Sequence, residues 1–292
     1  MASVCRASAF MALSTAAVFA TAAPAMASPF VYSDFSSTVG LTLNGAATTP
    51  VTGDGTVLRL TPAATGQGGS VFTTSQISLG VGATFSTFFQ FRFTNPGGIS
   101  PADGIAFVLQ TVNNNVGGIG GGLGYQGIPN SVAVEFDTFP NGPGVGDPDG
   151  NHVAIDTNGV LNGSGVTVNG QQNCTNNATV IGTPNCMANG DKWSVWIDYD
   201  GTALHVAVAQ NSVVRPADII TQNINIASFL GQNTAFIGFT GATGAGFENQ
   251  DILNWQFVDA FAPINSETPE PATLVLIGTG LAGLAARRRR RA

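Results

Sequence analysis

The sequence predicts one all-β domain, and three observations support this fold class. Between residues 28 and 265 the chain is rich in Gly, Thr, Asn and Val and has hardly any Lys. No long stretch repeats its apolar residues with the 3.6-residue period of a helix. Several short segments instead alternate with the period of two that is typical of strands, and Gly-rich segments separate them. Many short strands joined in this way indicate a sandwich or a barrel.

The expected strands follow from this alternation. Residues 85–94 place Phe85, Phe89, Phe91 and Phe93 on one face, as in a strand with one buried side. Residues 193–199 and 204–208 alternate in the same way on either side of the Asp200-Gly201 turn, which predicts a hairpin. The remaining expected strands are Ser131 to Asp137, Val153 to Asp156, Ala235 to Thr240 and Asn254 to Phe261.

The first 27 residues have the features of a signal peptide. Arg6 precedes an apolar stretch from Ala7 to Ala23, and Ala25-Met26-Ala27 offers the small-x-small pattern that signal peptidase cleaves. A buried N-terminal helix is the disfavoured alternative, because the segment is rich in Ala and this composition ends at Ser28. We therefore expect residues 1–27 to direct export.

The last residues, 266–292, have the features of a second targeting segment. Pro269-Glu270-Pro271 precedes an uncharged stretch from Ala272 to Ala286 and the arginine cluster Arg287 to Arg291. This order resembles the PEP-CTERM sorting signal of Gram-negative bacteria. The resemblance implies processing by an exosortase-type membrane enzyme and delivery to the cell surface or extracellular matrix. A plain membrane anchor is the alternative, although its apolar run is shorter than the roughly 20 residues that span a bilayer.

The charge of the expected mature domain disfavours one class of partner. Residues 28–268 contain four basic and 16 acidic residues, hence a net charge of −12. Nucleic acid is an unfavourable partner for such a surface. Divalent cations suit it, although high acidity alone more often reflects a well-solvated surface.

Cys174 and Cys186 are the cysteines that remain after removal of the signal peptide. In an exported protein two such cysteines are expected to form a disulfide. They make a poor metal site, because no histidine lies near them in the sequence.

Acidic and polar residues gather in and after the strand expected at 131–137. Glu135 and Asp137 stand two residues apart, so they share one face of that strand, opposite the apolar side chains of the other face. Two carboxylates on one face repel unless a cation lies between them. Asn141, Asp147 and His152 follow. Oxygen ligands suit calcium, and an imidazole added to carboxylates suits manganese or a similar transition metal.

These residues resemble the legume (L-type) lectin family, of which concanavalin A is a member. The resemblance implies a concanavalin-A-like jelly-roll β-sandwich over residues 28–265. It also implies manganese ligands and calcium ligands at corresponding positions. Manganese would take Glu135, Asp137, Asp147 and His152; calcium would share Asp137 and Asp147 and add the Phe139 carbonyl and the Asn141 side chain. Asp149 is the reserve for Asp147, because loop length varies here.

The same resemblance implies a sugar site built from four loops. In the first, Ala102-Asp103-Gly104, the Asp follows a cis peptide bond and accepts hydrogen bonds from two sugar hydroxyls. The second is Gly120 to Gly124, where the backbone of Gly121 or Gly122 contacts the sugar. In the third, the Asn141 side chain binds the sugar and the Phe139 ring stacks on it. The fourth is residues 238–248, where Ala245 and Gly246 lend backbone contacts.

The expected function is therefore a secreted or surface-attached calcium- and manganese-dependent lectin that binds exopolysaccharide or cell-surface glycans. A glycoside hydrolase of the same fold is disfavoured, because no second Glu follows Glu135-x-Asp137 at the spacing that retaining glucanases use. A matrix protein that has lost sugar binding is the other alternative. His205 is expected to be a solvated histidine rather than a ligand. The resemblance has no counterpart for residues 157–191, and it predicts neither the sugar nor the oligomeric state.

Overall fold

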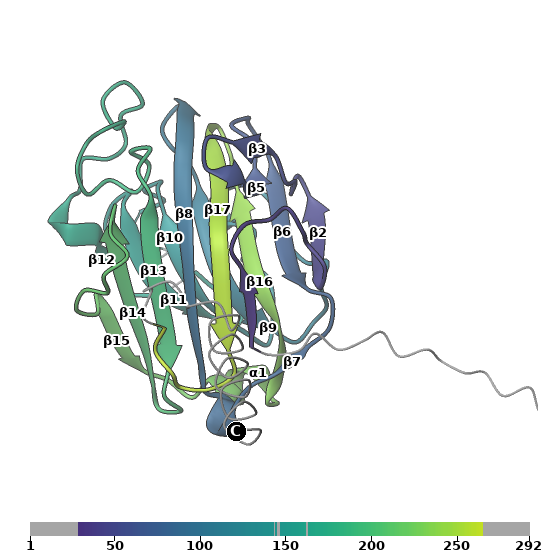
Figure 1. Cartoon of the computed structure of the whole chain (residues 1–292). Helices are drawn as coiled ribbons and strands as arrows, with labels where there is room; N and C mark the ends of the chain where they lie inside the picture. The colour runs from purple at the N-terminus through teal and green to yellow at the C-terminus, as the bar shows by residue number, and fades with distance from the viewer. Residues whose placement is uncertain (1–28, 143, 145–146, 162, 265–292) are drawn as a thin grey trace, which may run out of the picture.

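A computed structural model describes residues 29–264 of the chain, with the exception of residues 143, 145–146 and 162. Two antiparallel sheets pack face to face as a jelly-roll β-sandwich (Figure 1). The expected signal peptide and sorting tail lie outside the described residues. Among the residues described, no helix is long and apolar enough to cross a membrane.

The first sheet follows the order β1-β17-β8-β13-β14-β15, with β5 also paired to β17, and the second follows β12-β11-β10-β9-β16-β6-β2, with β7 paired to β16. The strands of the first sheet are β1 (Phe30–Tyr32), β5 (Leu58–Thr61), β8 (Phe85–Gly98), β13 (Trp193–Tyr199), β14 (Ala203–Gln210), β15 (Ile220–Asn223) and β17 (Gly246–Val258). Those of the second are β2 (Leu41–Gly45), β6 (Gly68–Thr73), β7 (Ile77–Ser78), β9 (Gly104–Gln110), β10 (Ser131–Asp137), β11 (His152–Thr157), β12 (Val166–Thr167) and β16 (Thr234–Ala242). The small hairpin β3 (Val51–Thr52) and β4 (Gly55–Thr56) and the short helices η1 (Val81–Ala83), η2 (Gly120–Gly122), η4 (Val168–Gly170) and α1 (Ile226–Leu230) complete the described elements.

Aromatic side chains from both sheets form the core. The ring of Phe89 in β8 lies 6.1 Å from that of Phe107, 5.8 Å from that of Phe136 and 4.9 Å from that of Phe239, all three on the second sheet. Side chains of the two sheets that interlock in this way are typical of a sandwich. The alternating Phe side chains of residues 85–94 thus lie on the inner face of β8, as expected.

Most of the expected strands are present, and one is displaced. β10 coincides with the expected segment, and β13 and β14 form the expected hairpin, in which Asp200 Oδ1 accepts hydrogen bonds from the backbone of Thr202 and Ala203. The strand expected at 254–261 is wrong in position, because β17 begins at Gly246 and ends at Val258. Its polar first half is paired and largely buried inside the sheet, and two register shifts interrupt its pairing with β8.

The structure contains the expected disulfide. Cys174 and Cys186 are joined, and both are buried. They lie in the segment between β12 and β13, outside both sheets.

Candidate functional site

The pairing register of the second sheet gathers the functional residues at one end of the sandwich. In β10, Asp137 lies opposite His152 of β11 and Gly104 of β9, and Gly104 lies opposite Ala242 of β16. Asp103 continues this pairing beyond the strands. Its backbone N–H donates to the Ala242 carbonyl at 2.9 Å, and its carbonyl accepts from the backbone N–H of Thr138 at 3.0 Å.

Three residues expected to bind metal form a compact buried group. Glu135, Asp147 and His152 each offer one ligand atom, and these atoms all lie within 4.8 Å of one another. His152 Nε2 is 3.4 Å from Glu135 Oε1 and 3.5 Å from Asp147 Oδ1. Within the described part of the chain, Glu135 Oε2 and His152 Nε2 have no hydrogen-bond partner. Because buried polar atoms without partners are costly, this donor set fits a cation, and its mixture of imidazole and carboxylate suits a transition metal.

The electrostatics of these groups lead to the same interpretation. Burial lowers the pKa of His152, but the Glu135 and Asp147 carboxylates outweigh that effect and raise it. Burial also raises the pKa of Asp147. Asp137 is fully buried, and burial together with the charges of Glu135 and Asp147 raises its pKa well above the usual range. A cation would favour the ionised form of all three carboxylates.

Asp137 stands beside the compact group rather than in it. Its charge interacts with Glu135 and Asp147, and its Oδ1 accepts a hydrogen bond from the backbone N–H of Phe139 at 2.6 Å. The backbone of Asn141 similarly donates to Asp147 Oδ2 at 2.7 Å. The loop after β10 is therefore folded back onto the carboxylates.

The structure distinguishes Asp147 from Asp149. Asp147 faces His152, whereas the carboxylate of Asp149 accepts hydrogen bonds from the Asn151 backbone and the Thr167 hydroxyl. The Asp149 carbonyl lies 2.7 Å from His152 Nδ1. Because a carbonyl only accepts, Nδ1 carries the proton and Nε2 is left to face the carboxylates.

Asp103 lies where the expected sugar loops meet. Its peptide bond with Ala102 is cis, as the resemblance implied. Its side chain is 4% exposed, burial raises its pKa to about 7, and among the described residues its Oδ2 has no hydrogen-bond partner. The neighbouring loops are close. A Cβ atom at Gly244 would lie 3.3 Å from Asp103 Oδ2, and one at Gly121 would lie 2.6 Å from the Asn141 amide.

The small residues at the end of the fourth loop lie in different surroundings. A Cβ atom at Gly246 would lie 2.4 Å from the Ser100 carbonyl, so Gly246 packs beneath the first loop, and Ala245 is exposed with its carbonyl toward Ile99. Gly244 is the residue of the fourth loop that faces Asp103. In the second loop, Gly121 faces Asn141, while Gly122 faces Gln126. The third loop presents an exposed Asn141 and a half-buried Phe139.

Sequence reasoning missed Glu248. This carboxylate is fully buried, accepts a hydrogen bond from Thr138 Oγ1 at 2.8 Å, and interacts electrostatically with Asp103. Burial raises its pKa well above the usual range. The available signal was a lone acidic residue at the end of the Gly-rich fourth loop.

His205 lies apart from the cluster, on the first sheet. It is partly exposed in β14, and its Nδ1 is 3.0 Å from Asp218 Oδ2.

Comparisons with known proteins agree with this architecture. The family model described as "Legume lectin domain" matches residues 27–272, and "PEP-CTERM protein-sorting motif" matches residues 267–291. The latter motif indicates export and sorting in Gram-negative bacteria.

Curated relatives include the lectin alpha chain of Lablab purpureus, 31% identical over 206 residues that cover 67% of this chain and 66% of the relative. A putative L-type lectin-domain containing receptor kinase I.10 of Arabidopsis thaliana is 31% identical over 240 residues, which cover 78% of this chain. The chain spans 38% of the length of that kinase and 28% of receptor kinase VIII.1.

Solved structures similar to this one include the lectin from Bauhinia forficata in complex with GalNAc and the winged bean acidic lectin complexed with methyl-α-D-galactose. Both have a TM-score of 0.62 and 25% sequence identity, and each comparison covers 78% of this chain and 96% of the other. Since the family match spans most of the sequence, this chain belongs to the legume lectin family of carbohydrate-binding proteins.

Proposed function

We propose that the protein is an exported, calcium- and manganese-dependent lectin that binds exopolysaccharide or cell-surface glycans. The observation that carries this proposal is the buried Asp103 carboxylate, which has an oxygen without a partner among the described residues and lies at the meeting point of the loops. An ionised carboxylate in such a position is a strong acceptor for sugar hydroxyl groups. The proposed sugar-binding residues are Asp103, Gly121, Gly122, Phe139, Asn141, Ala245 and Gly246, with Gly244 added from the geometry.

Two cations are proposed beneath this site. Glu135, Asp137, Asp147 and His152 would hold manganese or another transition metal. Calcium would take Asp137, Asp147, the Phe139 carbonyl and the Asn141 side chain. Bound cations would neutralise the buried carboxylates, and the chain's own contribution is to hold the loop after β10 against the Asp103 loop through the Thr138 to Asp103 backbone hydrogen bond.

We propose separate roles for the two ends of the chain and for the domain between them. Residues 1–27 would be a signal peptide, residues 28–265 the lectin domain and residues 266–292 a sorting tail. An exosortase-type enzyme would process the tail and leave the domain at the cell surface or in the extracellular matrix.

A broad glycan array tests the proposed function. We expect the purified protein, with calcium and manganese present, to bind a defined subset of glycans. Galactose and GalNAc glycans are the first probes, because two similar structures are complexes with methyl-α-D-galactose and GalNAc. If no glycan is bound across the array, the alternative of a matrix protein without sugar binding is the better description.

A further inference from the structure

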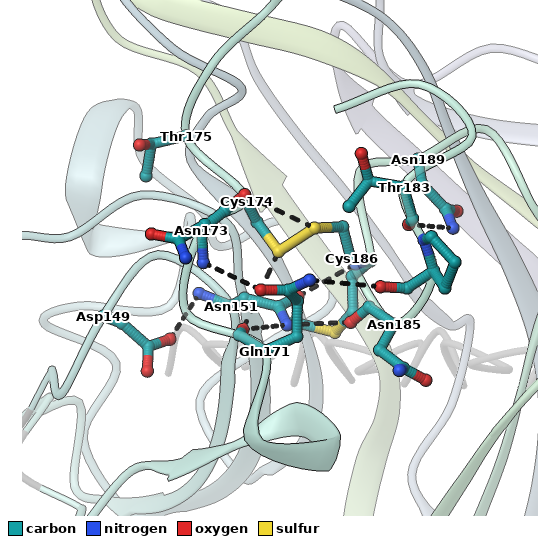
Figure 2. The surroundings of a disulfide bond; sticks show 12 residues. Asp149, Asn151, Gln171, Asn173, Cys174, Thr175, Thr183, Asn185, Cys186 and Asn189 are labelled. Carbon is teal, nitrogen blue, oxygen red and sulfur yellow. Dashed lines mark hydrogen bonds between the residues drawn. A yellow bond between two sulfur atoms is a disulfide. The ribbon is translucent and has the colours of Figure 1, made fainter. Parts of the chain in front are cut away.

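An insertion, residues 157–191, runs from the last residue of β11 to just before β13, and the proposed function does not use it. The Cys174–Cys186 disulfide closes its central part (Figure 2). Around the disulfide, Cys174, Val180, Cys186 and Ala188 form a small separate apolar cluster, while Val168 and Met187 of the insertion pack into the main core. The part of the loop between the two cysteines has little apolar surface to bury, so its order depends on the cross-link.

Asn151 connects this insertion to the loop before β11. Its side chain is fully buried, and its amide nitrogen donates to two carbonyls, those of Gln171 and Asn185, both at 2.9 Å. Its Oδ1 accepts from the backbone N–H of Met187, also at 2.9 Å. Asn185 and Met187 flank Cys186, and Gln171 lies three residues before Cys174. The disulfide therefore joins the two segments that form hydrogen bonds with the Asn151 side chain, as Figure 2 shows.

The contacts continue from Asn151 to the imidazole of His152. The backbone N–H of Asn151 donates to Asp149 Oδ1 at 2.8 Å, and the Thr167 hydroxyl donates to the other oxygen of the same carboxylate. The Asp149 carbonyl then accepts from His152 Nδ1, which turns Nε2 toward Glu135 and Asp147. All the side chains in this chain of contacts except that of Thr167 are buried.

We propose that the disulfide-closed insertion is the support that orients His152 toward a transition-metal ion, with Asn151 as the positioning residue, so that metal affinity depends on the disulfide. This inference rests on the proposed metal centre. Partners that orient a ligating imidazole typically change metal affinity 10- to 100-fold when they are lost. Among the described residues, the buried metal-binding group contains neither Asn151 nor a residue of the insertion, so their effect on the metal would pass through the direction of the His152 ring.

Titration with Mn²⁺ alone tests the proposal. Free Mn²⁺ is measured by electron paramagnetic resonance, and nitrogen modulation of the bound spin echo reports coordination by histidine. The Cys174→Ser/Cys186→Ser double variant is expected to bind Mn²⁺ 10- to 100-fold more weakly than the parent and to show weaker nitrogen modulation. The matched control is Thr183→Ala, which removes a hydrogen bond to the Thr179 carbonyl inside the same loop but none that leads to Asn151. It should bind Mn²⁺ like the parent.

Equal Mn²⁺ affinity in the parent and a cooperatively melting double variant overturns the inference while leaving the metal centre intact. If the double variant does not melt cooperatively, Thr167→Val decides, because it removes a single hold on Asp149 from a short edge strand. A several-fold loss of affinity in Thr167→Val supports the inference, and no loss overturns it. A parent that does not bind Mn²⁺ contradicts the proposed metal centre and the inference together.

Discussion

Replacement of Asp103 by Asn should abolish glycan binding and leave the fold and the metal centre intact. The two side chains have nearly the same shape, so the change removes the charge of the acceptor and one of its two accepting oxygens. Hydrogen bonds to a charged group contribute about 1.5–3 kcal/mol each. If two sugar hydroxyls bind this carboxylate, the loss is about 3–6 kcal/mol, which corresponds to a decrease in affinity of roughly 10²- to 10⁴-fold.

Stability should not fall in this variant. Asp103 Oδ2 has no hydrogen-bond partner among the described residues, and burial raises the pKa of the carboxyl to about 7, so the ionised group is a cost to the folded state at pH 8. Isothermal titration calorimetry with the tightest glycan from the array measures the affinity, and thermal unfolding measures the stability. Asp259→Asn is the matched control, because Asp259 follows the opposite end of β17. Undiminished glycan affinity in Asp103→Asn would refute the assignment of the sugar site.

With free metal at 100 times its Kd, binding stabilises the folded state by about 2.7 kcal/mol, and chelation should remove that stabilisation. The melting temperature of a domain of this size should then fall by about 5–11 °C, and an unchanged melt would exclude a metal bound to the native state. In the metal-free protein, four buried groups have raised pKa values: Asp103, Asp137, Asp147 and His152. The folded state therefore keeps protons that the unfolded chain has lost, and the free energy of unfolding should fall as pH rises from about 4 through 7. Thermal melts at pH 5 and pH 8 in chelator check this sign. Gly244→Ala should weaken glycan binding by crowding Asp103, while Gly118→Ala, whose new Cβ meets no atom within 4 Å, should bind like the parent in the same calorimetric assay.

The sorting proposal has its own prediction. The mature protein should lack Arg287 to Arg291 and should be recovered from the cell surface or matrix, because processing at the tail removes the arginine cluster. Intact mass spectrometry of the native product measures this. A product that still ends at Ala292 and remains in the inner membrane would indicate a plain anchor.

The all-β class and several central strands could be predicted from sequence because those strands alternate strongly, whereas the jelly-roll arrangement came from the family resemblance. In β8 and in the β13–β14 hairpin the buried faces carry large apolar side chains, so the period of two is visible without the partner strands. The first half of β17 was missed for the opposite reason. Its buried side chains are polar, and their partners are distant in sequence, as in the ion pair of Asp251 with Arg59.

The positions of the metal-binding side chains could be predicted in more detail than the backbone contacts of the sugar loops. Glu135 and His152 lie in or at the start of paired strands, and the alternation of those strands fixes the sides on which they lie. The backbone contacts of the Gly-rich fourth loop depend on its contour instead. An offset of two residues decides whether Gly244 or Gly246 faces Asp103, and neither composition nor spacing specifies that offset. The role of Asn151 was equally hidden, because its partners come from an insertion 20 to 36 residues away.

Glycan binding measured through a cycle of chelation and metal return tests the central claim most directly. A single preparation is applied to the array as purified, after removal of divalent cations with EDTA, and after calcium and manganese are added back. We predict binding in the first state, loss of all glycan signals in the second, and recovery of the same glycan profile in the third. Binding that persists unchanged in EDTA, while elemental analysis shows no residual metal, would contradict a cation-dependent lectin site built on Asp103, Asn141 and the buried carboxylates.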